Sequence, residues 1–258
     1  MKVRAAHSLP PTRAALWTAA GALALSIGWE GAARIVDSAL ILPGPVATLR
    51  ALLALARTER FLLAALGSTL RVAAGLAFAI PVAALVGIAS GLDARVRAFV
   101  RPFFSVVAAT PVLSVILIAL LWFGQERTPI FTSFLMIFPV MAANAAEGVR
   151  SADKRLLEVS RVYGLSRLAR LRHLYLPTLA PYLLAGARSS LSLCWKVVVA
   201  AEVIAQPARS LGAGMQAAKA MLETTELFAW TAATVLLAAV TELALPAFKK
   251  RRLHAPRR

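Results

Sequence analysis

The sequence predicts an all-α membrane protein, a polytopic bundle of about six transmembrane helices, and three observations support this fold class. First, 59% of its 258 residues are hydrophobic, against about 45–50% in soluble domains. Second, only 16% are charged, which is too few to cover so much apolar surface. Third, long apolar runs alternate with short basic clusters, a pattern typical of membrane proteins. Disorder is excluded, because disordered chains have low hydrophobicity.

Six apolar runs are long enough to cross a bilayer, which takes about 20 residues of helix. They cover residues 14–33, 66–90, 103–123, 129–149, 180–205 and 227–248. Pro81, Pro111 and Pro139 fall inside three of these runs. Prolines are tolerated in membrane helices where neighbouring helices or hydroxyl groups satisfy the freed carbonyls, so we expect kinks rather than breaks.

The distribution of basic residues orients these spans. One set of alternate loops and tails carries 19 Lys and Arg, and the other set carries 7. Since cytoplasmic loops are enriched in basic residues, we expect both termini in the cytoplasm: a tail at 1–13, a transmembrane domain at 14–248 and a basic tail at 249–258. The first run could instead be a signal peptide, but it continues past Gly28 without a convincing cleavage site.

Several other classes of function find little support in the composition. The 29 Lys and Arg against 12 Asp and Glu are scattered, whereas a nucleic-acid-binding protein gathers its basic residues in one patch. Cys194 is the single cysteine, so neither a disulfide nor a cysteine metal cluster is expected. The G-x-x-x-x-G-K-[ST] phosphate loop is missing, so we expect no ATP hydrolysis by that route.

The loop at 150–177 holds the most specific pattern. Apolar residues recur there every three positions, close to the helical period, and basic residues occupy much of the remaining surface. Gly164 interrupts this pattern, and a glycine permits a turn; Pro177 stands where a new helix begins. We therefore expect two short amphipathic helices joined at a glycine. They could lie on the membrane surface, act as a spacer or dock into the groove of a cytoplasmic partner.

A spaced motif in this loop favours docking. It consists of Glu158-Val159-Ser160, then three residues, then Gly164, then nine residues, then Leu174-Tyr175-Leu176-Pro177. The pattern resembles the EAA loop of ABC importer permeases, which reads Glu-Ala-Ala, three residues, Gly, nine residues, Ile, any residue, Leu-Pro. Val159 and Ser160 replace the two alanines, and Leu174 replaces the isoleucine. The frame of glutamate, glycine and Leu-Pro is kept.

Further segments extend the resemblance over residues 40–248. They are Leu42-Pro43-Gly44-Pro45, Ser68-Thr69-Leu70-Arg71-Val72 with Gly75, Arg101-Pro102, Leu121-Trp122-Phe123-Gly124, Trp195-Lys196 and Ala201-Glu202-Val203. Together they look like the nitrate/sulfonate/taurine branch of the ABC importer permeases.

This resemblance implies a type I importer permease in a bacterial inner membrane. Such a permease forms a homodimer, is not itself an enzyme and binds no cofactor, since ATP is bound by two copies of a separate ABC ATP-binding subunit. A periplasmic or lipid-anchored solute-binding protein delivers the solute outside, and membrane lipid surrounds the spans. The resemblance also assigns coupling to the ATPase to the following residues: Glu158, Val159, Ser160, Gly164, Leu165, Leu176 and Pro177.

Charged residues inside spans are costly, so each is a candidate for function. Arg71 and Glu147 lie near predicted span ends, from which long side chains can reach water, so we expect a structural role for both. Lys196 and Glu202 lie deeper and point about 120° apart on one helix, so they should face different neighbours. Lys196 either borders the path of an anionic solute or is a charge buried in helix packing or in the dimer interface, and Glu202 is a second path candidate without an assigned role.

Two rival classes remain open. A membrane-embedded enzyme would need converging acids, nucleophiles or metal ligands, which the scattered intramembrane charges do not predict. A secondary transporter or channel working without an ATPase is the stronger rival, although such proteins usually show internal repeats and none is evident here. The solute itself cannot be read from the sequence.

Overall fold

The computed structural model describes residues 11–244, and within this range the chain is built from helices and turns without strands. The predicted all-α fold class is confirmed. The helices are α1 (Pro11–Val36), α2 (Pro45–Leu55), α3 (Glu59–Leu92), α4 (Ala94–Ala109), α5 (Val112–Arg150), α6 (Lys154–Val162), α7 (Arg167–Arg170), a π-helix (Leu171–Tyr175), α8 (Leu176–Ala205), α9 (Leu211–Ala220) and α10 (Thr224–Ala244). Of the two predicted tails, residues 1–10 and 249–258 lie outside the described range.

Within residues 11–244, four helical segments are long and apolar enough to span a membrane: α3, α5, the continuous run Leu168–Ala205, and α10. Four of the six predicted spans lie on these segments, although the last extends beyond Ala244, the final described residue. The predicted first span lies on α1, which is not among the four. About six spans therefore stays an expectation rather than a finding.

The predicted third span, 103–123, is wrong as a single helix. The structure divides it between α4 and the beginning of α5, with Thr110 in an extended conformation (ψ 127°) between them. The cause is Pro111, since a proline disfavours the helical conformation of the residue before it. A second break follows at Gly124, whose φ of 68° and ψ of −176° belong to a region that is essentially restricted to glycine.

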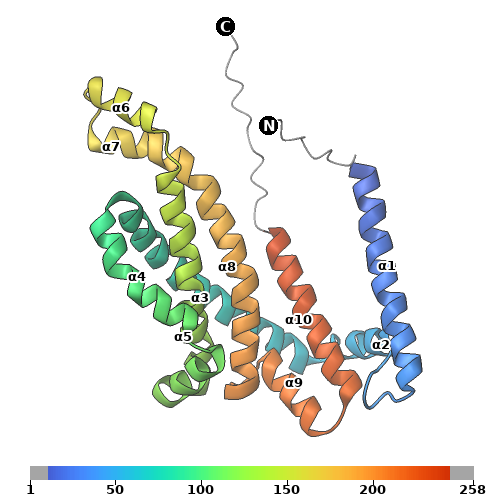
Figure 1. Ribbon diagram of the computed structural model, residues 1–258. Coiled ribbons are helices and arrows are strands. Elements are labelled where there is room, and N and C mark those ends of the chain that lie inside the picture. The colour runs from blue at the N-terminus through green and yellow to red at the C-terminus, as the bar shows by residue number, and fades with distance from the viewer. Residues whose placement is uncertain (1–10, 245–258) are drawn as a thin grey trace.

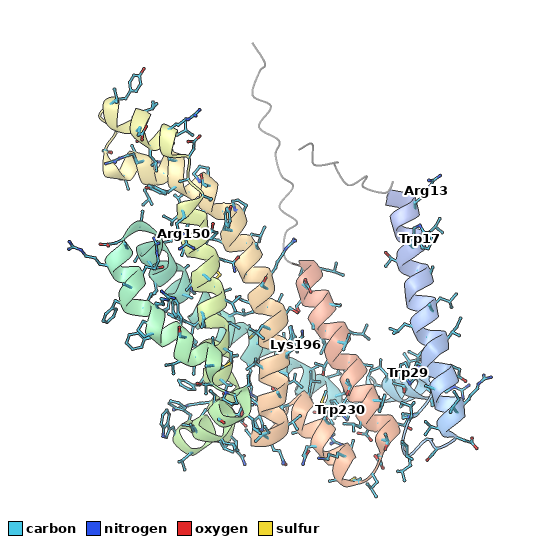
Figure 2. All side chains as sticks on the ribbon, viewed as in Figure 1. Arg13, Trp17, Trp29, Arg150, Lys196 and Trp230 are labelled. Atoms are coloured by element: carbon cyan, nitrogen blue, oxygen red, sulfur yellow. The ribbon has the colours of Figure 1, made fainter. Side chains whose placement is uncertain are left out.

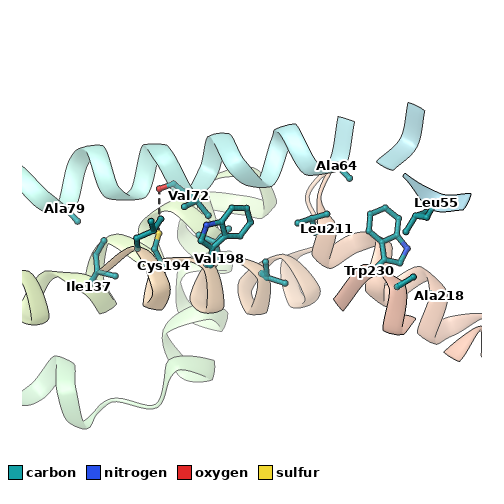
Figure 3. Close-up of a cluster of buried hydrophobic side chains, with 14 residues drawn as sticks. Leu55, Ala64, Val72, Ala79, Ile137, Cys194, Val198, Leu211, Ala218 and Trp230 are labelled. Atoms are coloured by element: carbon teal, nitrogen blue, oxygen red, sulfur yellow. Dashed lines mark hydrogen bonds between the residues drawn. The ribbon is translucent and has the colours of Figure 1, made fainter. Parts of the chain in front are cut away.

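The core of the bundle forms where α3, α5 and α8 pack together. Figure 3 shows part of it, with Cys194 and Val198 of α8 facing Val72 of α3. Small residues allow this close packing, as is common between membrane helices. At Gly186 of α8, a Cβ atom would lie 2.9 Å from both the Asn144 Cβ and the Met141 Sδ of α5. A larger residue would therefore push α8 away from α5.

The bundle has two distinct ends (Figure 1). The α6–α7 end carries the two short helices, and the first turn of α1 and the last turn of α10 point towards it. The opposite end, here called the α9 end, carries α2, α9 and the first part of α5. Most of α1 stands apart from the rest of the chain, which it joins near Trp29, whose indole Nε1 donates to the Pro43 carbonyl at 3.0 Å.

Candidate functional site

The two short helices at the α6–α7 end form as the sequence predicts. Asp153 precedes α6, and its carboxylate accepts a hydrogen bond from the Arg155 N–H at 2.8 Å. Ser166 precedes α7 and accepts from the Ala169 N–H at 3.2 Å. Asp and Ser are favoured at such positions because their side chains satisfy N–H groups that lack a helical partner. Both helices therefore begin at residues whose chemistry favours a helix start.

Gly164 makes the turn between them. Its φ is +66°, in the left-handed region that costs most other residues about 1–2 kcal/mol. The next N–H, of Leu165, donates to the Ser160 carbonyl at 2.9 Å, which is the six-to-one bond of a Schellman-type helix end. A Cβ atom at Gly164 would meet nothing within 4 Å. The constraint at this position is therefore conformational and not steric.

Apolar side chains on these helices face outwards. Leu156 is 54% exposed and Val162 is 85% exposed, and Val159 and Tyr163 are exposed as well. Glu158 is also exposed, Leu165 is half-buried, and Ser160 turns inwards, where its hydroxyl donates to the Leu157 carbonyl at 2.7 Å. Burying such apolar area is favourable by about 25 cal/mol per Å². The surface formed by Leu156, Val159 and Val162 is therefore suited to contact with another molecule.

The second half of this loop runs into the membrane without a break. The sequence predicts a new helix at Pro177, and α8 does begin at Leu176. However, α7, the π-helix and α8 are continuous, because the wider π turn accommodates a proline ring that would otherwise clash with the carbonyl four residues earlier. The Leu176 N–H donates to the Leu171 carbonyl. Leu176 and Pro177 are themselves exposed.

A charge cluster of Arg71, Glu126 and Glu202 lies at the α9 end, and two of its three charged residues are buried. The Arg71 guanidinium of α3 lies 2.6 Å from the Glu126 carboxylate of α5 and 3.2 Å from that of Glu202 on α8. It also donates to the carbonyls of Ala208 and Arg209, at 2.9 and 3.3 Å. Arg71 is therefore buried and bonded through both Nη atoms, so its side chain does not extend to water from the span end, and these contacts agree with the structural role expected for it. Carboxylates on two other helices compensate the charge of Arg71, which water would solvate if the side chain were exposed.

Glu202 is enclosed completely, with no exposed surface. The Ser68 hydroxyl donates to its carboxylate, lying 2.8 and 2.7 Å from the two oxygens, and the Gly212 N–H donates at 3.2 Å. A Cβ atom at Gly212 would overlap the Glu202 side chain, so glycine permits this approach. The Ser68 hydroxyl thus joins α8 to α3, and the Gly212 N–H joins α8 to the first turn of α9.

Glu126 closes the cluster on its outer side. Its side chain is 60% exposed, and its second oxygen accepts from the Ala208 N–H at 2.8 Å. The break at Gly124 lies two residues before it and separates the first part of α5 from the helix that carries Glu126. Arg71, Glu126 and Glu202 together fix the turn between α8 and α9, where Gln206 and Arg209 have positive φ angles.

Lys196 lies apart from this cluster, as the helical angle predicts. It is exposed and lines a cavity of about 520 Å³ between α8, α9 and α10, together with Trp195, Thr234 and Glu242. Figure 2 shows Lys196 on the side of α8 that faces α10. Glu202 does not reach this cavity or any surface. Glu147, by contrast, is exposed near the end of α5 and pairs with Arg150 at 2.7 Å.

Sequence reasoning missed three members of the charge cluster. Ser68 stands three residues before Arg71, a spacing that places both on one helix face, so a local signal for this member exists. Glu126 follows the Trp122-Phe123-Gly124 segment without any sign of its partner. Gly212 lies ten residues after Glu202, and only the three-dimensional path of the α8–α9 turn brings the two together.

Comparison with known proteins identifies relatives over most of the chain. Residues 79–253 match the family described as "Binding-protein-dependent transport system inner membrane component". The taurine transport system permease protein of Escherichia coli (strain K12) is 33% identical over 236 residues, which cover 89% of this chain and 86% of the relative. A putative aliphatic sulfonates transport permease protein of Bacillus subtilis (strain 168) is 27% identical over 86% of this chain and 76% of its own length. A bicarbonate transport system permease protein of Synechococcus elongatus is 33% identical over 54% of this chain and 50% of its own length.

Proposed function

Because this chain belongs to the family of binding-protein-dependent transport system inner membrane components, we propose that two copies of it enclose the solute path of an ATP-driven importer. The chain is a permease component of an ABC importer and a multi-pass protein of the inner membrane. A system of this kind also comprises an ATP-binding subunit and a solute-binding protein. We infer two copies of the ATP-binding subunit, one for each permease, and ATP bound there rather than by this chain.

The exposed apolar surface of Leu156, Val159 and Val162 is the docking site for the ATP-binding subunit in this proposal. A single observation supports it most strongly: a protruding helix presents apolar side chains to solvent beside a glycine turn. Amphipathic helices use such faces to enter a partner's groove. The resemblance of the segment from Glu158 to Pro177 to the EAA loop implies the same contact with the ATP-binding subunit.

The continuity of the helices suggests how movement is transmitted. Arg150 at the end of α5 is separated from α6 by only three residues, and α7 continues through the π-helix into α8. Any displacement of α6 is therefore passed to α5 and α8, the two helices that pack along the centre of the bundle. Packed helices shift as rigid elements between discrete arrangements. Closure of the ATP-binding subunits would in this way open or close the path between the permeases.

Both termini are cytoplasmic in this proposal. The start of α1 and the end of α10 point towards the α6–α7 end (Figure 1), where an ATP-binding subunit must dock. Labelling of single cysteines introduced at the two ends of the chain in sealed vesicles tests this directly. The natural Cys194 is fully buried, so it should contribute little background. Labelling of terminal cysteines from the periplasmic side would contradict the orientation.

We propose that a small solute with an anionic group, such as a sulfonate, taurine or nitrate, passes Lys196. Relatives named for taurine, sulfonates and bicarbonate and the exposed ammonium group in a largely apolar cavity support this assignment. Lys196→Ala should lower uptake of a transported anion about tenfold, the effect of losing one charged hydrogen bond, whereas Lys196→Arg should keep most of it. Reconstituted vesicles with radiolabelled taurine, sulfonate or bicarbonate provide the measurement. Unchanged uptake by an assembled Lys196→Ala complex would contradict the assignment.

Glu202 has a structural role in this proposal and is not a path residue. It is sealed by Ser68, Arg71 and Gly212 in this conformation. A carboxylate so placed holds the turn between α8 and α9, and it presents no oxygen to a passing solute.

A further inference from the structure

A second cavity lies near the α6–α7 end, on the opposite side of the bundle from α10. It has a volume of about 370 Å³ and is formed by the end of α3, by α4 and by α5. Arg97, Arg101 and Arg150 line it, and Figure 2 shows Arg150 near the base of the two short helices. None of these residues takes part in the docking surface or the charge cluster.

The charge of this cavity is positive. Arg97 is held against its wall by a hydrogen bond from Nε to the Ser90 carbonyl at 3.1 Å. Arg150 shares its charge with Glu147, which accepts from its Nε and Nη2 atoms at 3.2 and 2.7 Å. Arg101 is exposed at the same cavity. Three arginines and no carboxylate are among the residues that line the cavity, and only Arg150 is paired with a nearby glutamate, so positive charge is in excess. Guanidinium binds phosphate well because its fork fits two oxygens.

Apart from Ser90 and Ser105, the remaining walls of the cavity are apolar. They include Val100, Phe104, Pro139 and Ala142, and Phe104 packs edge-to-face on Phe138 with ring centroids 5.7 Å apart. No residue of α4 is buried, so this helix leaves a crevice against α5 rather than sealing it. A small soluble anion gains nothing from such walls, whereas an amphiphile with a charged head and a hydrocarbon chain fills both parts.

We propose that this cavity binds an anionic phospholipid of the cytoplasmic leaflet, with its phosphate on Arg97 and Arg101 and an acyl chain along Phe104 and Pro139. Basic pockets between helices on the cytoplasmic side are suited to such headgroups. The inference rests on the proposed orientation, in which the α6–α7 end is cytoplasmic. The bound lipid fills the gap between α4 and α5, since α4 makes few contacts within the chain.

Native mass spectrometry of the purified complex in mild detergent tests the proposal. Dioleoylphosphatidylglycerol and dioleoylphosphatidylethanolamine are added in equal amounts, and the lipid retained by each permease is counted. We expect selective retention of phosphatidylglycerol by the wild type. Affinity should fall about fivefold for each arginine removed in Arg97→Gln and Arg101→Gln, since one basic residue near anionic lipid contributes roughly that factor.

A matched control separates the site from general surface charge. Arg95→Gln removes the same charge from the same helix, but Arg95 does not line the cavity, so its lipid retention should equal that of the wild type. Equal retention by all variants would overturn the proposal. Displacement of phosphatidylglycerol by millimolar taurine would also overturn it, because the cavity would then bind the solute. Copurification of the ATP-binding subunit, measured in the same samples, reports on the proposed function independently.

Discussion

The two ends of the bundle differ in whether their charged and apolar side chains find partners within the chain. At the α9 end, Arg71 is bonded to both Glu202 and Glu126 and to the backbone of the α8–α9 turn. At the α6–α7 end, apolar residues such as Leu156 and Val162 face solvent. The charged side chains of the first region have their partners within one chain, and this region, here called the joint, holds α3, α5 and the α8–α9 turn together. The apolar side chains of the second region have no such cover, and their exposure indicates a partner.

The strongest test of this contrast removes the arginine from the joint. Arg71→Leu leaves Glu202 buried without its counter-charge, and breaking a buried pair in this way costs about 3–5 kcal/mol. We expect a large loss of thermal stability in detergent, measured by the unfolding midpoint of the purified chain. Arg50→Leu, which changes an exposed arginine on α2, is the control and should leave the midpoint nearly unchanged.

A double variant sharpens the same test. Replacing a buried ion pair by apolar residues is often neutral, so Arg71→Leu combined with Glu202→Leu should recover part of the loss. If the loss of stability in the double variant equalled or exceeded the sum of the two single losses, Arg71 and Glu202 would not act as a pair.

At the α6–α7 end, a substitution should affect the coupling of ATP hydrolysis to import and not the stability of the bundle. Gly164→Val places a β-branched residue at a φ of +66°, with a strain of about 1–2 kcal/mol, and should displace α7 relative to α6. Import should fall to near background, while the unfolding midpoint changes little. Gly164→Asn is the matched control, because asparagine tolerates this conformation. Equal import by the Val and Asn variants would show that the turn geometry is unimportant.

The turn at Gly164 is predicted correctly because its signal is local. A glycine between two stretches of regularly spaced apolar residues marks a turn. The flanking Asp153 and Ser166 are residue types that favour the start of a helix. The predicted helices at 66–90, 129–149 and 180–205 likewise follow from hydrophobic length alone. Features encoded by residues close together in the chain are therefore predictable from the sequence.

The charge cluster could not be predicted in the same way. Arg71 and Glu202 are 131 residues apart, and hydropathy does not report which helices pack together or with which register. The missed break at Thr110 has a different cause: a proline inside an apolar run, such as Pro111, predicts a kink as readily as a break. The extended Thr110 shows that the chain stops one helix and starts another there.

The smallest expected effect concerns Glu126, the exposed member of the joint. Its pair with Arg71 is partly screened by solvent, and exposed pairs contribute about 0–1 kcal/mol. Glu126→Gln keeps a carbonyl oxygen for the Ala208 N–H and should lower the unfolding midpoint only slightly, far less than Arg71→Leu. A loss as large as that of Arg71→Leu would mean that Glu126, rather than Glu202, balances the charge of Arg71.

Copurification of the ATP-binding subunit tests most directly whether the α6–α7 end is the docking surface. The tagged permease is isolated from native membranes in mild detergent, as the wild type and as Leu156→Asp, which changes an exposed side chain and should not unfold the bundle. Our account predicts that the ATP-binding subunit is recovered with the wild type and is largely lost with Leu156→Asp, while the permease remains folded and in the membrane. Recovery of the subunit in equal amounts with both chains would contradict the account.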